Sequence, residues 1–181
     1  MSPIFILAEL ILGKWFTQTG RRKDIFLATK FGVRDPDLPS GPPISTPSHI
    51  RKAVARSLKR LNTDYIDLYY QHRVDPNVPI EIVMETLKEC VDKGQIKWLG
   101  LSECSSDVLK RAKAVPGVGE KLIAAQMEYS PFTVEIEDDF LGVARELGVG
   151  IVAYSPLGRG LISGKYVLLE FKKEALLTIY K

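Results

Sequence analysis

The sequence holds few of the residues that build cross-linked or metal-centred proteins. Among its 181 residues there are two cysteines, Cys90 and Cys104, and two histidines, His49 and His72. The cysteines form no Cys-x-x-Cys pair and no Cys/His spacing typical of zinc sites, so we expect neither a disulfide framework nor a metal centre. Two thiols in an otherwise ordinary sequence indicate a reducing compartment, and we predict a cytoplasmic location.

No charge of one sign dominates, and no long apolar run is present. The 25 basic and 22 acidic residues are mixed along the chain and leave a net charge of +3. Without a basic stripe or an acidic tail, we predict neither nucleic acid nor a membrane as partner. The apolar start, residues 1–12, contains Glu9 and no signal-peptide cleavage pattern, so it indicates a helix. No stretch reaches the roughly 20 apolar residues of a membrane span.

Short apolar runs alternate with helical periods along the rest of the chain, which we predict to be one domain over residues 1–181. Runs typical of buried parallel strands cover residues 25–29, 65–71, 96–101, 122–127 and 149–154. Helical patterns cover residues 7–19, 47–61, 79–93 and 135–147, with a further helix capped by Ser105 or Ser106. The strands start about 25 to 40 residues apart, the size of a βαβ unit. The sheet is therefore expected to be parallel.

Two architectures fit this alternation. A doubly wound sheet needs only five strands, whereas a complete (β/α)8 barrel normally needs about 250 residues, so the length favours the doubly wound sheet. The turn after the first strand argues the other way. Lys30-Phe31-Gly32 leads into a proline-rich loop over residues 31–47 instead of a glycine-rich phosphate turn. The residue patterns alone leave both architectures open.

A polar residue closes each predicted strand. These residues are Lys30, His72, Ser102, Gln126 and Tyr154. Ligands of parallel α/β sheets bind outside the carboxyl ends of the strands, which makes all five candidate site residues. The first four also have a structural alternative: a lysine extended along a sheet edge, a satisfied histidine, an N-cap serine, and a glutamine bonded to neighbouring backbone.

The segment after the last strand, YSPLGRG over residues 154–160, has a composition suited to holding a pyrophosphate. It exposes backbone amides beside Arg159, and both groups bind phosphate oxygens. An ordinary turn has the same composition. The Gly158-x-Gly160 pair taken alone is a weak dinucleotide signal.

Five segments together resemble the aldo-keto reductase family, in order, over residues 12–166. They are IFLATKFG (25–32), YIDLYYQH (65–72), GQIKWLGLSE (94–103), QMEYS (126–130) and AYSPLGRG (153–160). The segments HRVDPNVP (72–79) and SPLGRG (155–160) are most similar to the branch that contains pyridoxal reductases and perakine reductase.

The resemblance implies an NADPH-binding (β/α)8 barrel of which this chain contains about the third to seventh of eight strands. Lys30 and His72 match two members of the catalytic tetrad, and Ser102 and Gln126 match residues that hold the nicotinamide carboxamide. Tyr154 matches the ring that stacks on the nicotinamide, and Ser155, Leu157 and Arg159 match residues along the pyrophosphate. Glu103 stands where many relatives carry asparagine, and residues 167–181 depart from the family.

The residues that the family uses as general acid have no counterpart in this sequence. In the family a tyrosine, assisted by the lysine and an aspartate, protonates the carbonyl while hydride passes from NADPH, and both residues precede the lysine. This sequence has no tyrosine before Tyr65 and no aspartate before Asp24. A positioned acid contributes roughly 10²- to 10⁴-fold, and His72 is expected to replace it only weakly. We therefore predict an incomplete barrel, truncated at both ends, with open strand edges through which copies could associate.

Three functions follow from these observations. The first is a truncated NADPH-dependent aldo-keto reductase, which reduces the aldehyde or ketone of a small molecule to an alcohol by hydride transfer. The second is a catalytically silent member of the family that binds the cofactor or another protein. The third is a flavodoxin-like binding domain, which fits the strand count but not the ordered family segments.

Overall fold

The structure, a computed structural model, describes residues 3–33 and 41–163. Its strands are β1 (Ala28–Phe31), β2 (Ile66–Gln71), β3 (Ile96–Ser102), β4 (Leu122–Glu128) and β5 (Gly150–Tyr154). Its α-helices are α1 (Pro3–Thr19), α2 (Pro47–Leu61), α3 (Ile80–Asp92), α4 (Ser106–Lys113) and α5 (Phe140–Glu146). Short 3₁₀ turns are η1 (Arg22–Asp24), η2 (Gly119–Lys121), η3 (Glu135–Glu137) and η4 (Gly158–Ser163). The predicted tail 167–181 and part of the proline-rich loop lie outside the described residues.

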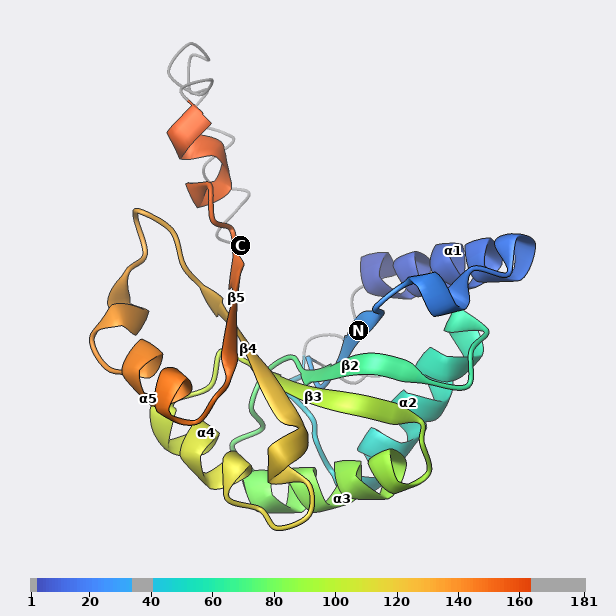
Figure 1. The fold of residues 1–181 in the computed structure, drawn as a ribbon, viewed down its shortest axis with the longest axis horizontal. Coiled ribbons are helices and arrows are strands. Elements are labelled where there is room, and N and C mark those ends of the chain that lie inside the picture. The colour runs from blue at the N-terminus through green and yellow to red at the C-terminus, as the bar shows by residue number, and fades with distance from the viewer. Residues whose placement is uncertain (1–2, 34–40, 164–181) are drawn as a thin grey trace.

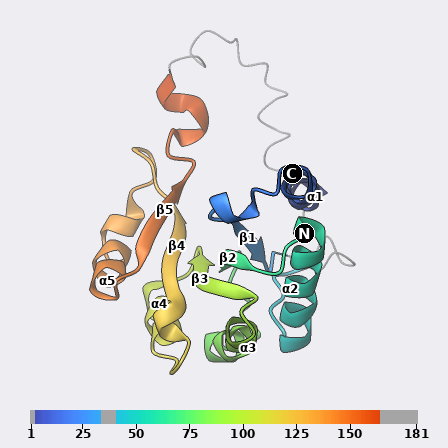
Figure 2. The same ribbon diagram turned by 45° about the vertical axis from the view of Figure 1, so that its right-hand side comes forward.

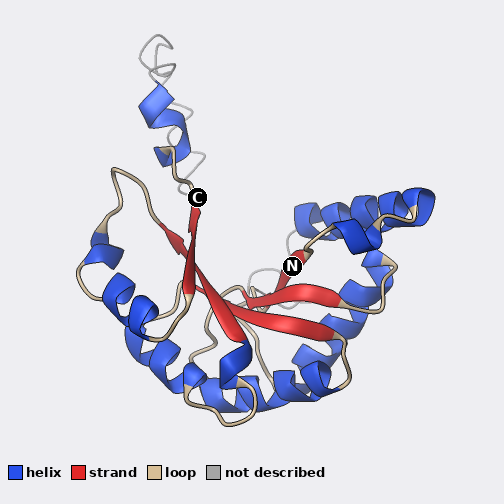
Figure 3. Ribbon diagram, in the orientation of Figure 1, coloured by secondary structure: helices blue, strands red, loops and turns tan. Residues whose placement is uncertain are grey.

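The order of the strands decides between the two architectures. All neighbouring pairs are parallel, and the spatial order β1-β2-β3-β4-β5 equals the order in the sequence. A doubly wound sheet reverses its order at a switch point and carries helices on both faces. Here α2 to α5 all cover the outer side of a curved sheet, and among residues 3–33 and 41–163 none of these helices lies on the inner side (Figures 1 and 3). The section of a (β/α)8 barrel is confirmed, and the doubly wound sheet that the length favoured is wrong.

Alternate side chains of the strands divide between the two faces of the sheet. On the outer face, Tyr69, Leu99 and Ala125 belong to the main core beneath the helices. On the inner face, Leu68 and Tyr70 form a small separate cluster with few neighbours. This period of two is the expected result of a pleated strand. Most apolar burial therefore lies between the sheet and its helices.

Helix α1 lies beside α2 near the β1 edge of the sheet (Figure 2). A Cβ atom at Gly13 would lie 2.2 Å from the backbone oxygen of Arg60, so only glycine allows the two helices to approach this closely. One turn earlier, the buried carboxylate of Glu9 accepts hydrogen bonds from Thr29 Oγ1 at 2.7 Å and Arg60 Nε at 2.6 Å. This carboxylate links α1 to both β1 and α2.

The first predicted strand is displaced and less buried than the sequence indicates. The apolar run predicted a buried strand over residues 25–29, whereas β1 begins at Ala28, and Ile25 and Phe26 are 37% and 61% exposed. Lys30 consequently lies within the strand and not after it. Leu27 and Phe31 are 4% and 1% exposed, so the apolar side chains that are exposed are the two that precede the strand, and within the described residues β1 is an edge strand. An apolar run in the sequence shows which side chains could be buried in a strand. Which of them are buried depends on the neighbouring parts of the fold.

The predicted helix over residues 135–147 is divided into η3 and α5. The break lies at Asp138 and Asp139, and the φ of Asp139 is −144°, outside the helical range. Aspartate has low helix propensity because its side chain competes for local backbone groups. The remaining helices and strands are confirmed within a few residues. Ser105 is the N-cap of α4, where its Oγ accepts a hydrogen bond from Val108 N at 3.2 Å.

The described residues supply three further observations about the expected class of protein. Cys90 and Cys104 are buried free thiols. Within residues 3–33 and 41–163, no group of three or more histidine, cysteine or acidic residues could hold a metal ion. Over the same residues, no helix combines the length and apolar character needed to cross a membrane.

Candidate functional site

The five strand-end residues lie at one end of the sheet. Lys30 is part of β1, His72 directly follows β2, Ser102 ends β3, Gln126 is part of β4 and Tyr154 ends β5. Because the strands are parallel, these positions share the carboxyl edge. Ser102 and Gln126 are direct register partners on adjacent strands. The sequence prediction that these positions share one edge of a parallel sheet is therefore realised.

Lys30 reaches across the inner face of the sheet. Its Nζ donates a hydrogen bond to Oε1 of Gln126, three strands away, and lies 5.6 Å from the centroid of the Tyr70 ring. The ring occupies space that a side chain at Gly100 would fill, since a Cβ atom there would lie 2.4 Å from the ring. Burial, and then the nearby positive charge of Arg73, lower the pKa of Lys30.

His72 is held beside β1 and is neutral at physiological pH. Its backbone N–H donates to the carbonyl oxygen of Phe31 at 2.7 Å. Burial, followed by repulsion from Lys30 and Arg73, lowers the pKa of His72 to about 4. A neutral imidazole can donate a hydrogen bond to a carbonyl oxygen but carries no additional proton to release. The role of substitute general acid that the sequence suggested for His72 is weakened further by this environment.

Arg73 belongs to the site, although sequence reasoning gave it no role. Its Nη1 donates to the carbonyl oxygen of His72 at 2.9 Å and to Oγ of Ser102 at 3.4 Å. The available signal was its position, directly after the strand-end histidine. That signal is weak because charged residues are common at strand ends, and only the spatial neighbourhood of β2 and β3 connects Arg73 to Ser102.

Acidic side chains gather on the other side of the site, near Tyr154. Glu103, in a left-handed backbone conformation (φ 53°), accepts a hydrogen bond from the backbone N–H of Glu128 at 2.9 Å. The hydroxyl of Tyr154 donates to Oε2 of Glu128 at 3.4 Å. Burial, and then the neighbouring Glu103, raise the pKa of Tyr154. Glu128 was also missed, although it follows Gln126 by two residues and so shares its face of β4.

The predicted pyrophosphate segment forms a turn beyond the end of β5 (Figure 1). Ser155 and Arg159 both have left-handed backbone conformations, with φ of 52° and 53°, and the Leu157 side chain is exposed. Gly158 is required here because a Cβ atom would lie 2.5 Å from the Phe132 ring. Within the described residues no hydrogen bond or ion pair joins these side chains to the strand-end group. The turn is therefore joined to the strand-end group through the backbone that follows Tyr154.

A cavity of about 460 Å³ runs along the edge of β1. Lys30, His72 and Gln126 line it from the inner face, whereas Glu9 and His49 line it from the helix side. The sequence analysis assigned His49 no functional role. This residue lines the cavity because the first turn of α2 packs beside β1. Ser102 and Tyr154 do not line this cavity, so the candidate cofactor positions extend beyond it along the carboxyl edge.

Comparison with known proteins gives a consistent result. A model of the aldo/keto reductase family matches residues 1–175. Aldo-keto reductase str7 of Strobilurus tenacellus is 52% identical over 162 residues, which cover 88% of this chain and 46% of that protein. Aldo-keto reductase yakc of Schizosaccharomyces pombe, whose name specifies NADP(+), is 50% identical over 87% of this chain and 46% of its own length.

A solved structure shares the fold as well as the sequence. Aldo-keto reductase AKR11C1 from Bacillus halodurans, in its holo form, superposes with a TM-score of 0.74 at 34% identity. The match covers 86% of this chain and 50% of the other. The chain thus spans about half the length of the relatives that it matches.

Proposed function

The chain belongs to the aldo/keto reductase family, and from this premise we propose that it forms the cofactor-facing part of an NADPH-dependent reductase site. The proposed reaction reduces the aldehyde or ketone of a small molecule to an alcohol. One observation carries the proposal: five polar residues from five successive strands meet at the carboxyl edge, linked across the sheet by the hydrogen bond from Lys30 to Gln126.

The side chains at this edge have the chemistry that NADPH requires. Ser102 and Gln126 lie side by side and offer hydrogen-bonding groups for the nicotinamide carboxamide. Tyr154, two strands from Ser102, offers an aromatic ring for the nicotinamide. Ser155, Leu157 and Arg159 follow in a turn that offers a hydroxyl, backbone amides and a guanidinium to the pyrophosphate. When bound, NADPH supplies the hydride that reaches the carbonyl carbon.

Lys30 and His72 are the residues proposed to handle the carbonyl oxygen. Neutral His72 orients this oxygen by donating a hydrogen bond, and the positive charge of Lys30 stabilises the negative charge that develops on it. Burial and Arg73 lower the pKa of Lys30, so its ammonium releases a proton more readily than an exposed lysine does. Lys30 is therefore the best proton donor among the residues of this group.

A silent, cofactor-binding member of the family is the second candidate. It is favoured by the absence of a tyrosine before Tyr65 in the sequence and by the neutrality of His72. The strands β1 and β5 are edges of the described sheet, which supports self-association of copies. We further propose that the protein acts in the cytoplasm, in agreement with its free thiols, which fractionation of cells would test.

Titration of the folded chain with NADPH, followed by nucleotide fluorescence, tests cofactor binding. Consumption of NADPH with a panel of aromatic aldehydes and pyridoxal then tests turnover. Gln126→Ala should weaken binding and Lys30→Met should abolish turnover, whereas Arg51→Gln, at an exposed ion pair with Glu89, should change neither.

The outcomes separate the candidates. Binding with turnover supports the reductase, and binding without turnover supports the silent member. Folded protein that does not bind NADPH contradicts both cofactor-dependent proposals.

A further inference from the structure

The placement of Lys30 depends on a short strand with one neighbour. In the part of the chain that the structure describes, β1 pairs only with β2, and Lys30 forms no ion pair that would hold its ammonium. From β1 this side chain has to reach Gln126 on β4, three strands away. A displacement of about 1 Å can cost a reacting group roughly 100-fold in rate. The contacts that hold β1 in place therefore decide how well Lys30 can act.

A buried carboxylate on α1 holds the residue next to Lys30. Glu9 is 3% exposed, and its Oε1 accepts a hydrogen bond from the Thr29 hydroxyl at 2.7 Å. Its Oε2 accepts a hydrogen bond from Nε of Arg60, on α2, at 2.6 Å. Neighbouring residues of a strand point to opposite faces, so Thr29 faces the helices while Lys30 faces the inner side of the sheet. Glu9 thus fixes β1 from the face opposite to the site.

The other contacts of this segment do not replace Glu9. Asp67 accepts a hydrogen bond from the Leu27 N–H at 3.0 Å, but this contact lies three residues before Lys30. The carbonyl oxygen of Phe31 accepts from the backbone of His72 at 2.7 Å, which is part of the ladder between β1 and β2. The Glu9 carboxylate is ionically paired and shielded from water, so its hydrogen bonds are stronger than those of exposed groups.

We propose that Glu9 is a positioning residue which, through Thr29, holds Lys30 at the acceptor atom of Gln126 and beside the carbonyl oxygen of the substrate. This inference rests on the proposed function, in which Lys30 handles that oxygen. Both oxygens of the Glu9 carboxylate are occupied, one by Thr29 and one by Arg60. Glu9 therefore acts through β1 and not on the ligand itself, although it lies at the helix side of the same cavity.

Thr29→Val tests the inference, because valine suits a strand and has a similar shape but cannot donate to Glu9. Acylation of lysines at a series of pH values, followed by peptide mass spectrometry, measures the pKa of Lys30 without any need for turnover. We expect this pKa to rise toward its ordinary 10.5, since a displaced Lys30 is less buried and further from Arg73. The kcat should fall by about tenfold, whereas KM should stay within about twofold.

Three further variants separate positioning from stability. Thr29→Ser restores a hydroxyl and should return the Lys30 pKa and the kcat close to their native values. Glu9→Gln keeps a side chain that can bond the Thr29 hydroxyl but loses the ion pair with Arg60. It should lower stability and leave the Lys30 pKa nearly unchanged. Ile80→Val shortens a buried side chain in α3, which packs on α2, α4 and β3, and is the control for a general loss of stability.

A Lys30 pKa that stays unchanged in Thr29→Val, or that changes as much in Ile80→Val, overturns the inference whatever the turnover shows. Failure of Thr29→Ser to restore the native pKa does the same. If the pKa rises in Thr29→Val as expected but the native chain consumes no NADPH with any carbonyl compound, the proposed reductase fails while the placement of Lys30 by Glu9 stands.

Discussion

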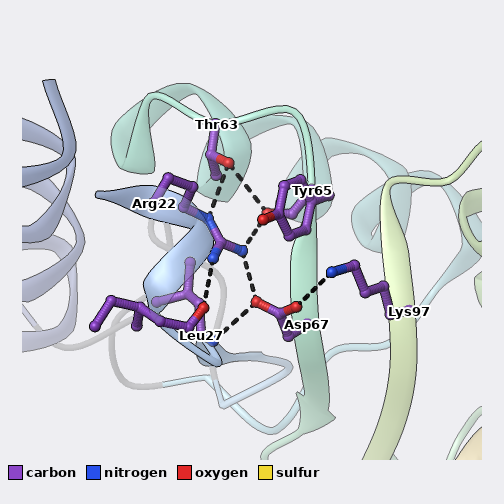
Figure 4. A network of polar contacts seen from close by, with 7 residues as sticks. Arg22, Leu27, Thr63, Tyr65, Asp67 and Lys97 are labelled. Carbon is purple, nitrogen blue, oxygen red and sulfur yellow. Dashed lines mark hydrogen bonds and ion pairs between the residues drawn. The ribbon is translucent and has the colours of Figure 1, made fainter. Parts of the chain in front are cut away.

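The two ends of the sheet differ in how their charged side chains are compensated. At the amino end, the buried carboxylate of Asp67 receives hydrogen bonds from Arg22 at 2.8 Å, Lys97 at 2.8 Å and the Leu27 N–H at 3.0 Å (Figure 4). Burial opposes ionisation of Asp67, but the bonds from Lys97, Leu27 and Arg22 outweigh it and lower the pKa. Arg22 also binds Thr63 Oγ1 and the Tyr65 carbonyl.

At the carboxyl end, like charges stand together. Burial, followed by repulsion from Lys30 and Arg73, lowers the pKa of His72, and no ion pair compensates either cation in the part of the chain that the structure describes. A satisfied network stabilises the fold, whereas groups with shifted pKa values and spare donors are typical of functional sites. The amino end therefore secures β1 in place, whereas the charges at the carboxyl end have no such partners and agree with the ligand site that we propose there.

The largest expected effect is at the amino end. Asp67→Asn should lower the free energy of unfolding by about 3 kcal/mol, because it leaves Arg22 without its charged partner in a buried position. Chemical denaturation measures the loss. The control Asp107→Asn removes an exposed carboxylate 3.7 Å from Arg111 and should cost about 0.5 kcal/mol or less. Equal costs for the two variants would mean that the Asp67 network is not a stabilising feature.

The next largest effect tests the packing of the Tyr70 ring against Gly100, since the Lys30 ammonium lies over this ring. Gly100→Ala should cost about 1 to 3 kcal/mol, because its Cβ would lie 2.4 Å from the Tyr70 ring. The double variant Gly100→Ala with Tyr70→Leu should recover part of this cost. Gly142→Ala, in α5 with nothing within 4 Å, should instead stabilise the helix by up to about 1 kcal/mol. A cost at Gly100 that the double variant does not reduce would contradict the packing of Tyr70 on this glycine.

The pH dependence of stability should distinguish the two ends. The folded pKa of His72 is about 4, below its ordinary 6.5, so the unfolded chain takes up a proton first as the pH falls. Stability should therefore decrease from pH 6.5 to 4, by about 1 to 2 kcal/mol after allowance for solvent screening of a half-buried group. Asp67 acts in a different window, since its contribution is lost only below its ordinary pKa of 3.8.

Denaturation curves at several pH values measure this effect, and His72→Gln should flatten the decrease. His49→Gln is the control for the other histidine. NMR titration of the His72 ring gives the pKa directly, and a value near 6.5 would remove the contrast between the two ends.

The smallest effect concerns the third partner of Asp67. Lys97 is 49% exposed, so Lys97→Met should cost about 0.5 to 1 kcal/mol in chemical denaturation. Arg22→Met should cost more, since the Arg22 side chain is 11% exposed. The reverse order would show that burial does not rank the donors of this network.

The sequence predicted the strands and helices better than the burial and the long-range contacts of their side chains. The strands β2 to β5 agree with the apolar runs, and α2 begins at Pro47 as the helical pattern over residues 47–61 predicts, although its N-cap Thr46 makes no capping hydrogen bond with its side chain. The first strand was misplaced because an apolar run over residues 25–29 does not reveal that the strand lies at an edge. The five strand-end residues were found, whereas Arg73 was not, since its contact with Ser102 spans 29 residues.

By itself the sequence determined the alternation of strands and helices and the residue type at each strand end, because both depend on periods of two and 3.6 residues within short segments. Only the tertiary structure decided the sequential order of the strands, the register that sets Ser102 opposite Gln126, and the separation of charges between the two ends. Those features depend on contacts between residues far apart in the chain, such as Arg22 and Asp67, 45 positions apart. A local pattern contains no information about which distant partner a side chain meets.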